Sequence, residues 1–346
     1  MKKALITGIN GQDGSYLAEY LFNLGYEVHG TKRRSSSSNT QRLHRLKKND
    51  TNSDIDYLVQ LHHADVTDSS SINSLVNSIR PDEIYNLAAQ SHVAVSFEEP
   101  EYTANSDALG CLRVLESIKQ IDKKIKFYQA STSELFGGQE TTAYNENSPI
   151  NPRSPYSAAK AYAYHVTRQY REAYGLFACN GILFNHESPR RSENFVSQKI
   201  VMGLKKISMK DISYISLGNL DARRDWGHAK DYVKSMVMIL NHTVPDDWVV
   251  ATGKSYSVRE FVITAFKQIG VTVEFHGKGL DEKAIVTESL CDTIKVGQVV
   301  VKINKKFFRP LEVNNLKGDA SKIKTQLGWK PEYNFEKLVA EMIHGE

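Results

Sequence analysis

Tyr156 and Lys160 stand four positions apart and are the residues of this sequence best suited to chemistry at a hydroxyl group. This spacing places both side chains on one face of a helix. A tyrosine hydroxyl, with an ordinary pKa of about 10, is a weak base at neutral pH. A lysine ammonium group beside it favours the phenolate. The pair therefore predicts a base that takes the proton of a substrate hydroxyl while hydride leaves the same carbon.

A polar run, Ser131-Thr132-Ser133-Glu134, follows a predicted strand and offers a second set of reactive groups. Thr132 can hydrogen-bond a substrate oxygen. Glu134 supplies a carboxylate, which simple hydride transfer does not need but elimination of water does, because a carbon proton must be taken and the leaving hydroxyl must be protonated. An alternative interpretation is that Glu134 is a helix N-terminal carboxylate favoured by the helix dipole. The residues alone leave both interpretations open.

The glycines Gly8, Gly11 and Gly14 are spaced as G-x-x-G-x-x-G between an apolar run and a helical pattern. In that context the first glycine permits a tight turn, the second lets the backbone approach a pyrophosphate, and the third lets helix and strand pack closely. The helix N-terminus adds free N–H groups. We therefore predict dinucleotide binding rather than a simple tight turn. The intervening residues of this loop are predicted to share in it: Asn10, Gln12 and Asp13.

The end of the second predicted strand carries basic residues where an NAD enzyme usually has a carboxylate for the ribose 2′-hydroxyl. Arginine suits a 2′-phosphate because it binds bidentately and stays charged. The sequence thus predicts NADP(H), with Arg33, Arg34 and Ser35 on the 2′-phosphate. A solvated basic loop is the alternative. Asp65, at the end of the third strand, is positioned to accept from the adenine amino group, and Asp68 to cap a helix.

These motifs must be positioned by alternating strands and helices. A helical pattern after the first strand and recurring apolar runs indicate an α/β fold, a Rossmann-type doubly wound parallel sheet, with a smaller mixed α/β substrate-binding domain. Residues 32–54 are expected to form a long basic loop. The predicted strands are Ala4–Thr7, Glu27–Thr31, Leu61–Val66, Glu83–Ala89 and Ile125–Ser131, and the predicted helices include Gly14–Leu24 and Ala108–Ile118.

The bulk composition is that of an ordinary globular protein long enough for two domains: 346 residues, 40% hydrophobic and 24% charged. A formal net charge of +4 is too small to favour a nucleic-acid partner. No apolar run is long enough for a membrane span or a signal peptide. Three distant cysteines, Cys111, Cys179 and Cys291, lack metal-ligand spacing. We expect them to be reduced and buried, with no metal and a cytoplasmic location.

With these residues in hand, the chain resembles the extended short-chain dehydrogenase/reductase family and, within it, the GDP-mannose 4,6-dehydratases. Nearly the whole chain contributes, and together the motifs are highly specific. Related epimerases lack the glutamate at position 134, and dTDP-glucose dehydratases usually carry Asp where this chain has Ser133. One departure is Asn314, where the family usually has Asp. The most telling stretches are Gly8–Gly14, Arg33–Ser36, Asn86–Val93, Ser131–Gly137, Phe184–Arg191, Leu217–Gly227 and Arg309–Val313.

The resemblance implies oxidation of GDP-mannose at C4, elimination of water across C5 and C6, and return of hydride to C6. NADP(H) would be tightly bound and regenerated in each turnover, and the product would be GDP-4-keto-6-deoxymannose, a precursor of GDP-fucose or GDP-rhamnose. The catalytic set would be Thr132, Glu134, Tyr156 and Lys160. Cofactor contacts would add Ser36, Val66, Leu87, Ala88, Ala89, Gln90, Ser91, Tyr102, Lys160, His186 and Arg191. Substrate contacts would be Ser91, Thr132, Glu134, Tyr156, Asn185, Asn194, Lys199, Gly218, Arg223, Arg309 and Glu312.

The family also implies a division of the chain and an assembly. Residues 1–184 would form the NADP-binding domain, with about 217–250 returning to it, and 185–346 the GDP-sugar-binding domain. The Arg- and Ser-rich loop, residues 33–48, would reach a neighbouring subunit in a homotetramer or homodimer. Surface salt bridges are the alternative role for Arg223 and Arg309.

Four other functions stay open at this stage. A reductase that delivers hydride to the 4-keto product, or an epimerase, would use the same fold, although Glu134 argues against an epimerase. A non-catalytic NADP sensor typically lacks the tyrosine–lysine pair. Nucleic-acid binding through residues 32–48 would depend on local charge only.

Overall fold

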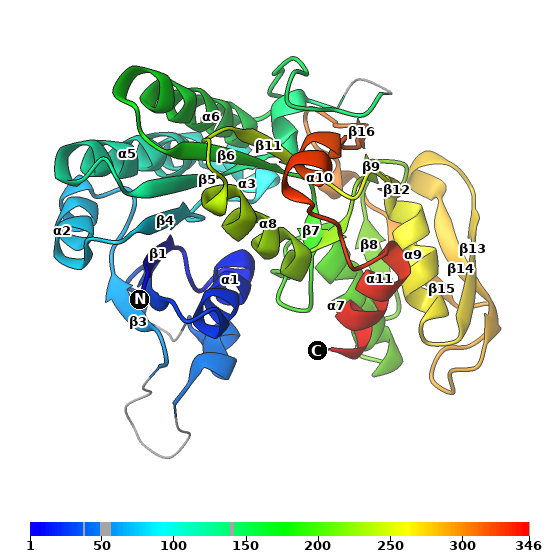
Figure 1. Cartoon of the computed structure of the whole chain (residues 1–346). Helices are drawn as coiled ribbons and strands as arrows, with labels where there is room; N and C mark the ends of the chain where they lie inside the picture. Colours follow the sequence, from blue (N-terminus) through cyan, green and yellow to red (C-terminus); the bar gives the residue numbers. More distant parts are fainter. Residues whose placement is uncertain (37–38, 49–56, 139–141, 346) are drawn as a thin grey trace.

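The computed structural model describes residues 1–36, 39–48, 57–138 and 142–345. Its centre is a seven-stranded sheet in which every neighbouring pair is parallel, in the order β11-β6-β5-β4-β1-β2-β3 (Figure 1). The strand order reverses beside β1, which is the doubly wound arrangement predicted from the sequence. The strands are β1 (Lys3–Thr7), β2 (Glu27–Lys32), β3 (Gln60–His63), β4 (Glu83–Asn86), β5 (Lys126–Thr132), β6 (Ala178–Leu183) and β11 (Asp247–Val250).

Helices cover both faces of this sheet, which is why its strands are apolar on both sides. One face packs against α2 (Ser69–Ile79), α5 (Gly110–Ile121) and α6 (Pro155–Tyr174), and the other against α1 (Gln12–Asn23) and α8 (Ala229–Asn241) (Figure 1). The start of α6 is fixed locally. Ser154 and Ser157 form a reciprocal capping box, and Pro155 occupies the first helical position. This cap sets the place of Tyr156 in the first turn.

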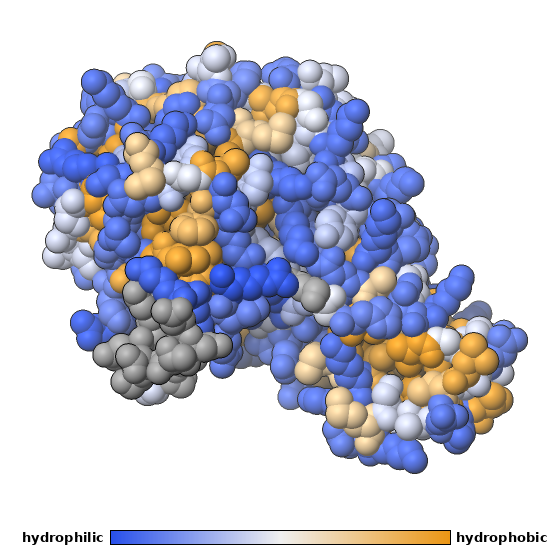
Figure 2. All heavy atoms as spheres, turned by 60° about the horizontal axis from the view of Figure 1, so that its bottom comes forward, coloured by the Kyte–Doolittle hydropathy of each residue, from blue (hydrophilic) through white to orange (hydrophobic). Residues whose placement is uncertain are grey.

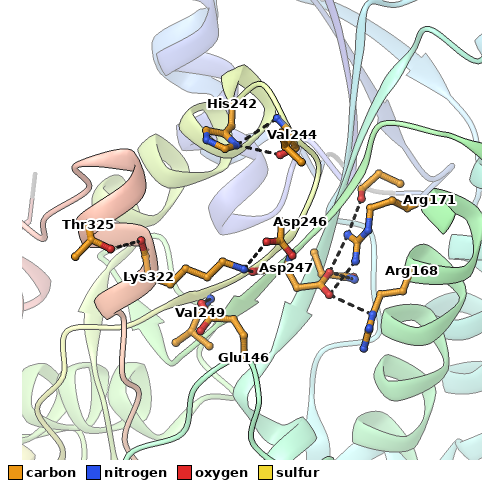
Figure 3. Close-up of polar contacts among 12 residues, drawn as sticks. Glu146, Arg168, Arg171, His242, Val244, Asp246, Asp247, Val249, Lys322 and Thr325 are labelled. Carbon is orange, nitrogen blue, oxygen red and sulfur yellow. Dashed lines mark hydrogen bonds and ion pairs between the residues drawn. The ribbon is translucent and has the colours of Figure 1, made fainter.

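The edge strand β11 is fastened to its neighbours by charged groups (Figure 3). Arg171 of α6 donates to both oxygens of Asp247, at 3.1 and 3.0 Å. Lys322, in α10 (Ser321–Leu327), bridges the Asp246 carboxylate and the Asp247 carbonyl. Glu146 accepts the N–H of Val249. Bidentate and part-buried pairs of this kind order an edge strand that would otherwise present open backbone groups.

The second lobe is built on a mixed four-stranded sheet in the order β13-β14-β15-β8. Its core includes Trp226, Phe261 and Phe335, whose rings contact one another. Two short sheets connect the lobes: β7 (His186–Glu187) with β10 (Gly227–His228), and β9 (Arg223–Arg224) with β12 (Tyr256–Ser257) and β16 (Asn315–Leu316). The other elements of this lobe are β8 (Ile215–Leu217), β13 (Val271–His276), β14 (Lys283–Ser289), β15 (Val299–Ile303), α7 (Val196–Ser208), α9 (Val258–Lys267) and α11 (Phe335–His344).

The described elements differ from the predicted ones mainly at their ends. The third and fourth strands stop at His63 and Asn86, earlier than predicted. After β4 the N–H groups of Leu87 and Ala88 donate to the Thr7 hydroxyl instead of to a neighbouring strand. The helix predicted from Ala108 begins as α5 at Gly110. It is preceded by α3 (Val93–Glu98), α4 (Pro100–Thr103) and a π-helical turn η2 (Ala104–Leu109), so the first two residues of the predicted helix lie in the π-helical turn.

The domain division predicted from the sequence stays a prediction, but the core places particular segments. Within residues 217–250, α8 and β11 pack in the first lobe. Residues 313–329, predicted to lie in the second domain, also bury side chains in the core of the first lobe: Val313, Leu316, Ala320, Ile323 and Trp329.

The cysteines and the surface were also the subject of predictions. Cys111 and Cys179 are buried and free, whereas Cys291 is only half-buried, contrary to expectation. Hydrophilic residues cover most of the face in Figure 2, and hydrophobic ones gather in smaller areas of both lobes. In the described part of the chain, no helix is both long and apolar enough to cross a membrane.

Candidate active site

The glycine loop after β1 forms a close-packed turn with no room for side chains at two of its positions. Gly8 has φ +73°, and a Cβ there would stand 3.0 Å from Ala88 Cα. A Cβ on Gly14 would stand 2.4 Å from the Gly8 carbonyl oxygen. The first turn of α1 follows directly, with Gly11 at the N-cap. Backbone N–H groups at a bare helix N-terminus beside glycines are the chemical setting for a pyrophosphate, so the loop fits a dinucleotide.

A cleft of about 380 Å³ lies at the carboxyl ends of β1, β4, β5 and β6, the edge where α/β sheets carry their sites. It brings together most of the residues predicted for cofactor and catalysis. Predicted residues that line it are Gly8, Asn10, Gly11, Gln12, Asp13, Gly14, Arg33, Asp65, Val66, Leu87, Ala88, Ala89, Ser91, Tyr102, Thr132, Glu134, Tyr156, Lys160, Asn185, His186, Arg191 and Arg309.

At the β2 end of the cleft, Arg33 is held by an aromatic neighbour. Its guanidinium donates to the Tyr102 hydroxyl at 2.6 Å and lies 6.0 Å from that ring. Lys32 and Asn39 line the same end, and Asn39 was missed from the sequence. Two predicted partners of the 2′-phosphate, Arg34 and Ser35, are exposed and lie outside the cleft lining, as does Ser36, which was predicted as a further cofactor contact.

Asp65 and Gln90 have polar partners of their own within the protein. The Asp65 carboxylate accepts from the N–H and the hydroxyl of Thr67, both at 2.9 Å, although the residue lines the cleft. Asp68 caps α2, as expected. The Gln90 amide donates to the His92 carbonyl and the Thr103 hydroxyl, which directs it away from the cleft lining.

Tyr156, Lys160 and Thr132 converge at the end of β5. The Lys160 ammonium donates to the Ala130 carbonyl at 3.0 Å and lies 5.9 Å from the centre of the Tyr156 ring. Thr132 and Tyr156 both line the cleft. Burial raises the pKa of the Tyr156 hydroxyl. In the protein alone the group is therefore a phenol, contrary to the phenolate expected from the neighbouring Lys160, and the charge of Asp107 adds to the effect of burial.

Asp107 is a charged residue of the site that the sequence did not reveal. It lies in the π-helical turn η2, is 2% exposed, and accepts from the Gln90 N–H at 2.7 Å and the Ser106 hydroxyl. Burial raises the pKa of its carboxyl, which the charge of Lys160 opposes, and its own charge raises the pKa of Tyr156. Its signal would have been an acid on the buried face of an otherwise apolar helix, at a turn type common in functional sites.

Glu134 is buried in the short 3₁₀ helix η3 (Ser133–Phe136), and the Thr132 hydroxyl accepts its N–H at 3.2 Å. Its position fits both interpretations that the sequence left open, a carboxylate at a helix N-terminus and a reactive group of the site. It lies in the first turn of a helix and faces the cleft that holds Tyr156. Its carboxylate is paired with Arg309 at 3.2 Å. A buried carboxylate beside a tyrosine–lysine pair can take a carbon proton next to an oxidised carbon.

His186 and Asp13 form an ion pair behind the glycine loop. Their Nε2 and Oδ2 atoms are 2.7 Å apart, and Nδ1 of His186 contacts the Phe184 carbonyl. Burial alone would lower the pKa of His186, but Asp13 raises it above its usual value. His186 in turn lowers the pKa of Asp13 against the effect of burial. The pair fixes the His186 ring next to the loop that would receive a diphosphate.

The basic loop contributes a residue that the sequence did not single out. Arg42, in the 3₁₀ helix η1 (Gln41–Leu46), donates to the Arg190 carbonyl at 2.7 Å and to the Asn10 carbonyl at 3.3 Å. Arg191 forms an ion pair with Glu187. The loop is therefore folded onto the glycine turn, and positions 37 and 38 of the predicted interface lie outside the described residues.

Comparison with known proteins decides among the uses of this cleft. A family model described as GDP-mannose 4,6 dehydratase matches residues 5–342. The chain belongs to the GDP-mannose 4,6-dehydratase family. The GDP-mannose 4,6-dehydratase of Vibrio cholerae is 54% identical over 99% of this chain and 93% of that protein. The human GDP-mannose 4,6 dehydratase is 51% identical over 99% of this chain and 91% of its own length.

Solved structures share the fold of this dehydratase family member at low sequence identity. A dTDP-glucose 4,6-dehydratase from Streptomyces venezuelae, solved with NAD and TYD bound, aligns with a TM-score of 0.79 at 20% identity, covering 99% of this chain and 96% of that one. A Thermus thermophilus UDP-glucose 4-epimerase in complex with NAD aligns with a TM-score of 0.76 at 21% identity, covering 99% of each chain.

The residues predicted for the nucleotide sugar in this family member fall into separate groups. Asn185 and Arg309 line the cleft. Lys199 lies farther out, with its ammonium 3.1 Å from the centre of the Phe307 ring, and Gly218 is so close to Phe307 that a Cβ would stand 2.4 Å from its carbonyl oxygen. Lys199 and Gly218 thus meet at one aromatic residue of the loop before β16.

Other predicted substrate residues of the family lie outside the cleft lining. Arg223 pairs with Glu260 at 3.1 Å and donates to the Ser255 carbonyl, so the structure shows the salt bridge that the sequence offered as the alternative. Glu312 accepts the N–H of Val313, and Asn194 is exposed. The backbone of Asn314, the departure from the family pattern, accepts from the Arg223 N–H at 2.8 Å.

Proposed function

We propose that this chain converts GDP-mannose to GDP-4-keto-6-deoxymannose and water. The observation that carries the proposal is the buried carboxylate of Glu134 in the same cleft as Tyr156 and Lys160. Hydride chemistry at a hydroxyl needs the tyrosine and lysine only. A carboxylate beside them is what elimination adds.

Tyr156 takes the proton of the mannose O4 hydroxyl, and Thr132 holds the same oxygen by a hydrogen bond. Lys160 favours the negative charge that develops on the tyrosine oxygen. A ketone at C4 makes the C5 proton acidic. Glu134 removes that proton and protonates the C6 hydroxyl, which leaves as water, so that the C5–H and C6–O bonds break and a C5–C6 double bond forms. Reduction at C6 and protonation at C5 complete the product.

We also propose that the cofactor is NADP(H). When bound, it would accept hydride from C4 and return it to C6. The glycine turn and the first turn of α1 would hold its diphosphate, and Arg33, backed by Tyr102, its 2′-phosphate. The absence of a carboxylate at the end of β2 supports this choice.

Mass spectrometry of GDP-mannose incubated with the protein and NADP+ tests the reaction. We expect a product lighter by one water with no net accumulation of NADPH. Glu134→Gln should keep cofactor binding and lose dehydration. An unchanged GDP-mannose mass with the wild-type protein, or full dehydration by Glu134→Gln, would contradict the proposal.

The cofactor assignment has a separate test. The double variant Arg33→Asp with Arg34→Ala should bind NADP+ at least tenfold more weakly and NAD+ about as before, because a 2′-phosphate contact is lost. Arg80→Ala, an exposed arginine far from the cleft, is the matched control. Unchanged NADP+ affinity in the double variant would refute the assignment.

We further propose a homotetramer or homodimer joined through residues 33–48, in a cytoplasmic location. The basic side chains in the described part of this segment support the first proposal, and the three free cysteines support the second. Light scattering coupled to size-exclusion chromatography should give a mass that is a multiple of 39.0 kDa. Reversing the charge at Arg34 should lower that mass. A monomer in the wild-type protein would refute the assembly.

A further inference from the structure

Arg309 and Glu134 join the two sides of the cleft. Arg309 follows the 3₁₀ turn η5 (Lys305–Phe307), in the connection from β15 to β16, whereas Glu134 follows β5 of the central sheet. Their Nη1 and Oε1 atoms are 3.2 Å apart, and the side chains are 29% and 9% exposed. The ion pair therefore places a guanidinium against the very carboxylate that is proposed to act on the sugar.

The charges around Arg309 favour exchange of its partner, the Glu134 carboxylate, for the diphosphate of a nucleotide. Arg224, fully buried nearby, donates to the carbonyls of Arg223 and Val313. Burial lowers the pKa of Arg224 to about 10, and the positive charge of Arg309 contributes to that lowering. Two cations, Arg224 and Arg309, thus stand near each other, and the negative charge of Glu134 opposes the lowering of the Arg224 pKa. A diphosphate entering the cleft would compete with Glu134 for Arg309, because charge-assisted bonds to phosphate suit a guanidinium geometrically.

We propose that Arg309 is a specificity-determining switch set by the diphosphate of the nucleotide sugar. Without nucleotide, Arg309 pairs with Glu134 and keeps that carboxylate from a sugar. With nucleotide, the diphosphate draws Arg309 away and leaves Glu134 free for the C5 proton. The inference rests on the proposed function for the role of Glu134, and it adds that the nucleotide part of the substrate releases the elimination step. A hexose lacking the diphosphate would leave Glu134 paired.

Competition for one guanidinium has a thermodynamic consequence that does not depend on turnover. If Glu134 and the diphosphate exclude each other on Arg309, then removing the charge of Glu134 must tighten binding of GDP, and the gain must disappear when Arg309 is absent. GDP is the suitable probe because it carries the diphosphate without a sugar, so it makes no demand on the sugar site beside Glu134.

The experiment is a double-mutant cycle on the Kd of GDP, measured by calorimetry on the full chain saturated with NADP+. We expect Glu134→Gln to lower the Kd by about twofold to tenfold, the range of a partly exposed ion pair. Arg309→Gln should raise the Kd. In the Arg309→Gln background, Glu134→Gln should leave the Kd unchanged. Glu341→Gln, which neutralises a carboxylate of α11 paired with Lys230 of α8, controls for the change in net charge.

Two outcomes would overturn the switch. One is an unchanged or higher Kd in Glu134→Gln. The other is the same tightening with and without Arg309, which would indicate simple repulsion between Glu134 and GDP. Glu134→Asp, which shortens the side chain and keeps its charge, gives a second measurement and should also tighten GDP binding by lengthening the pair. Because no variant needs to turn over, a failed cycle and a failed dehydration assay are distinguishable.

Discussion

Gly14→Ala tests the phosphate cradle directly, because the added methyl group would meet backbone. It would stand 2.4 Å from the Gly8 carbonyl oxygen and 2.7 Å from Ile9 Cα, whereas ordinary contacts begin at 3.4 Å. The N-terminal end of α1 must therefore withdraw from the loop by about 1 Å. Overpacking costs about 1–3 kcal/mol, offset by about 1 kcal/mol from the better helix propensity of alanine. We therefore expect the free energy of unfolding to fall by at most about 2 kcal/mol.

The same displacement should reduce cofactor affinity, since the N–H groups that face the diphosphate move with the helix. We expect the Kd of NADPH, measured by its fluorescence, to rise at least tenfold, which corresponds to about 1.4 kcal/mol. Gly25→Ala is the matched control. Gly25 has φ +81°, and a methyl group added there would meet no described atom within 4 Å beyond its chain neighbours, so the substitution carries only left-handed strain of about 1–2 kcal/mol. It should lower stability in urea yet keep the NADPH affinity. Wild-type affinity in Gly14→Ala would refute the reasoning.

Three further predictions follow from the charges of the site. Because Asp13 raises the pKa of His186 and His186 lowers that of Asp13, their pair is fully formed between about pH 4 and 6.5 and weakens as pH rises through the raised pKa of His186. His186→Asn should therefore cost more unfolding free energy in urea at about pH 5.5 than at about pH 9, and equal losses would contradict this. Burial lowers the pKa of Lys199 to about 8, so GDP affinity should fall as pH rises through that value, and Lys199→Gln should flatten the profile in calorimetry. Asp107→Asn removes a charge that raises the pKa of Tyr156, so the acid limb of kcat/KM should move to lower pH; a move to higher pH would refute the assignment.

The parts of the site that were predictable are those fixed by short-range spacing. The glycine turn, the four-residue step from Tyr156 to Lys160, and Glu134 just after a strand each need only a strand or helix boundary, which apolar periodicity marks. The parallel sheet and its two helical layers followed from the same periodicity.

The residues that were missed depend on packing between distant segments. Asp107 lies in a π-helical turn, which the apolar pattern of the helix does not mark, and its buried carboxyl is near enough to Lys160 for that charge to oppose the rise of its pKa on burial. Arg42 meets the glycine turn from a loop with little apolar pattern. A salt bridge of Arg223 was offered as an alternative, but its partner Glu260 was missed, because the pairing of β9 with β12 that brings it close leaves no local sequence pattern. Such contacts are decided by which surfaces meet.

Residues 313–329 return to the first lobe, and this path of the chain limits both where the protein can be truncated and how its cleft can open. After β6 the backbone passes to α7 and β8, back to α8 and β11, out again to α9 and the second sheet, and back once more through β16 and α10 before ending in α11. Neither lobe is a continuous stretch of chain, so a truncation after residue 184 would remove β11 from the edge of β6, and with it the fully buried Trp248 from the core of the first lobe. Bending about a single linker is also blocked. Opening of the cleft must be shared by several strands at once, which favours small sliding motions over wide swinging.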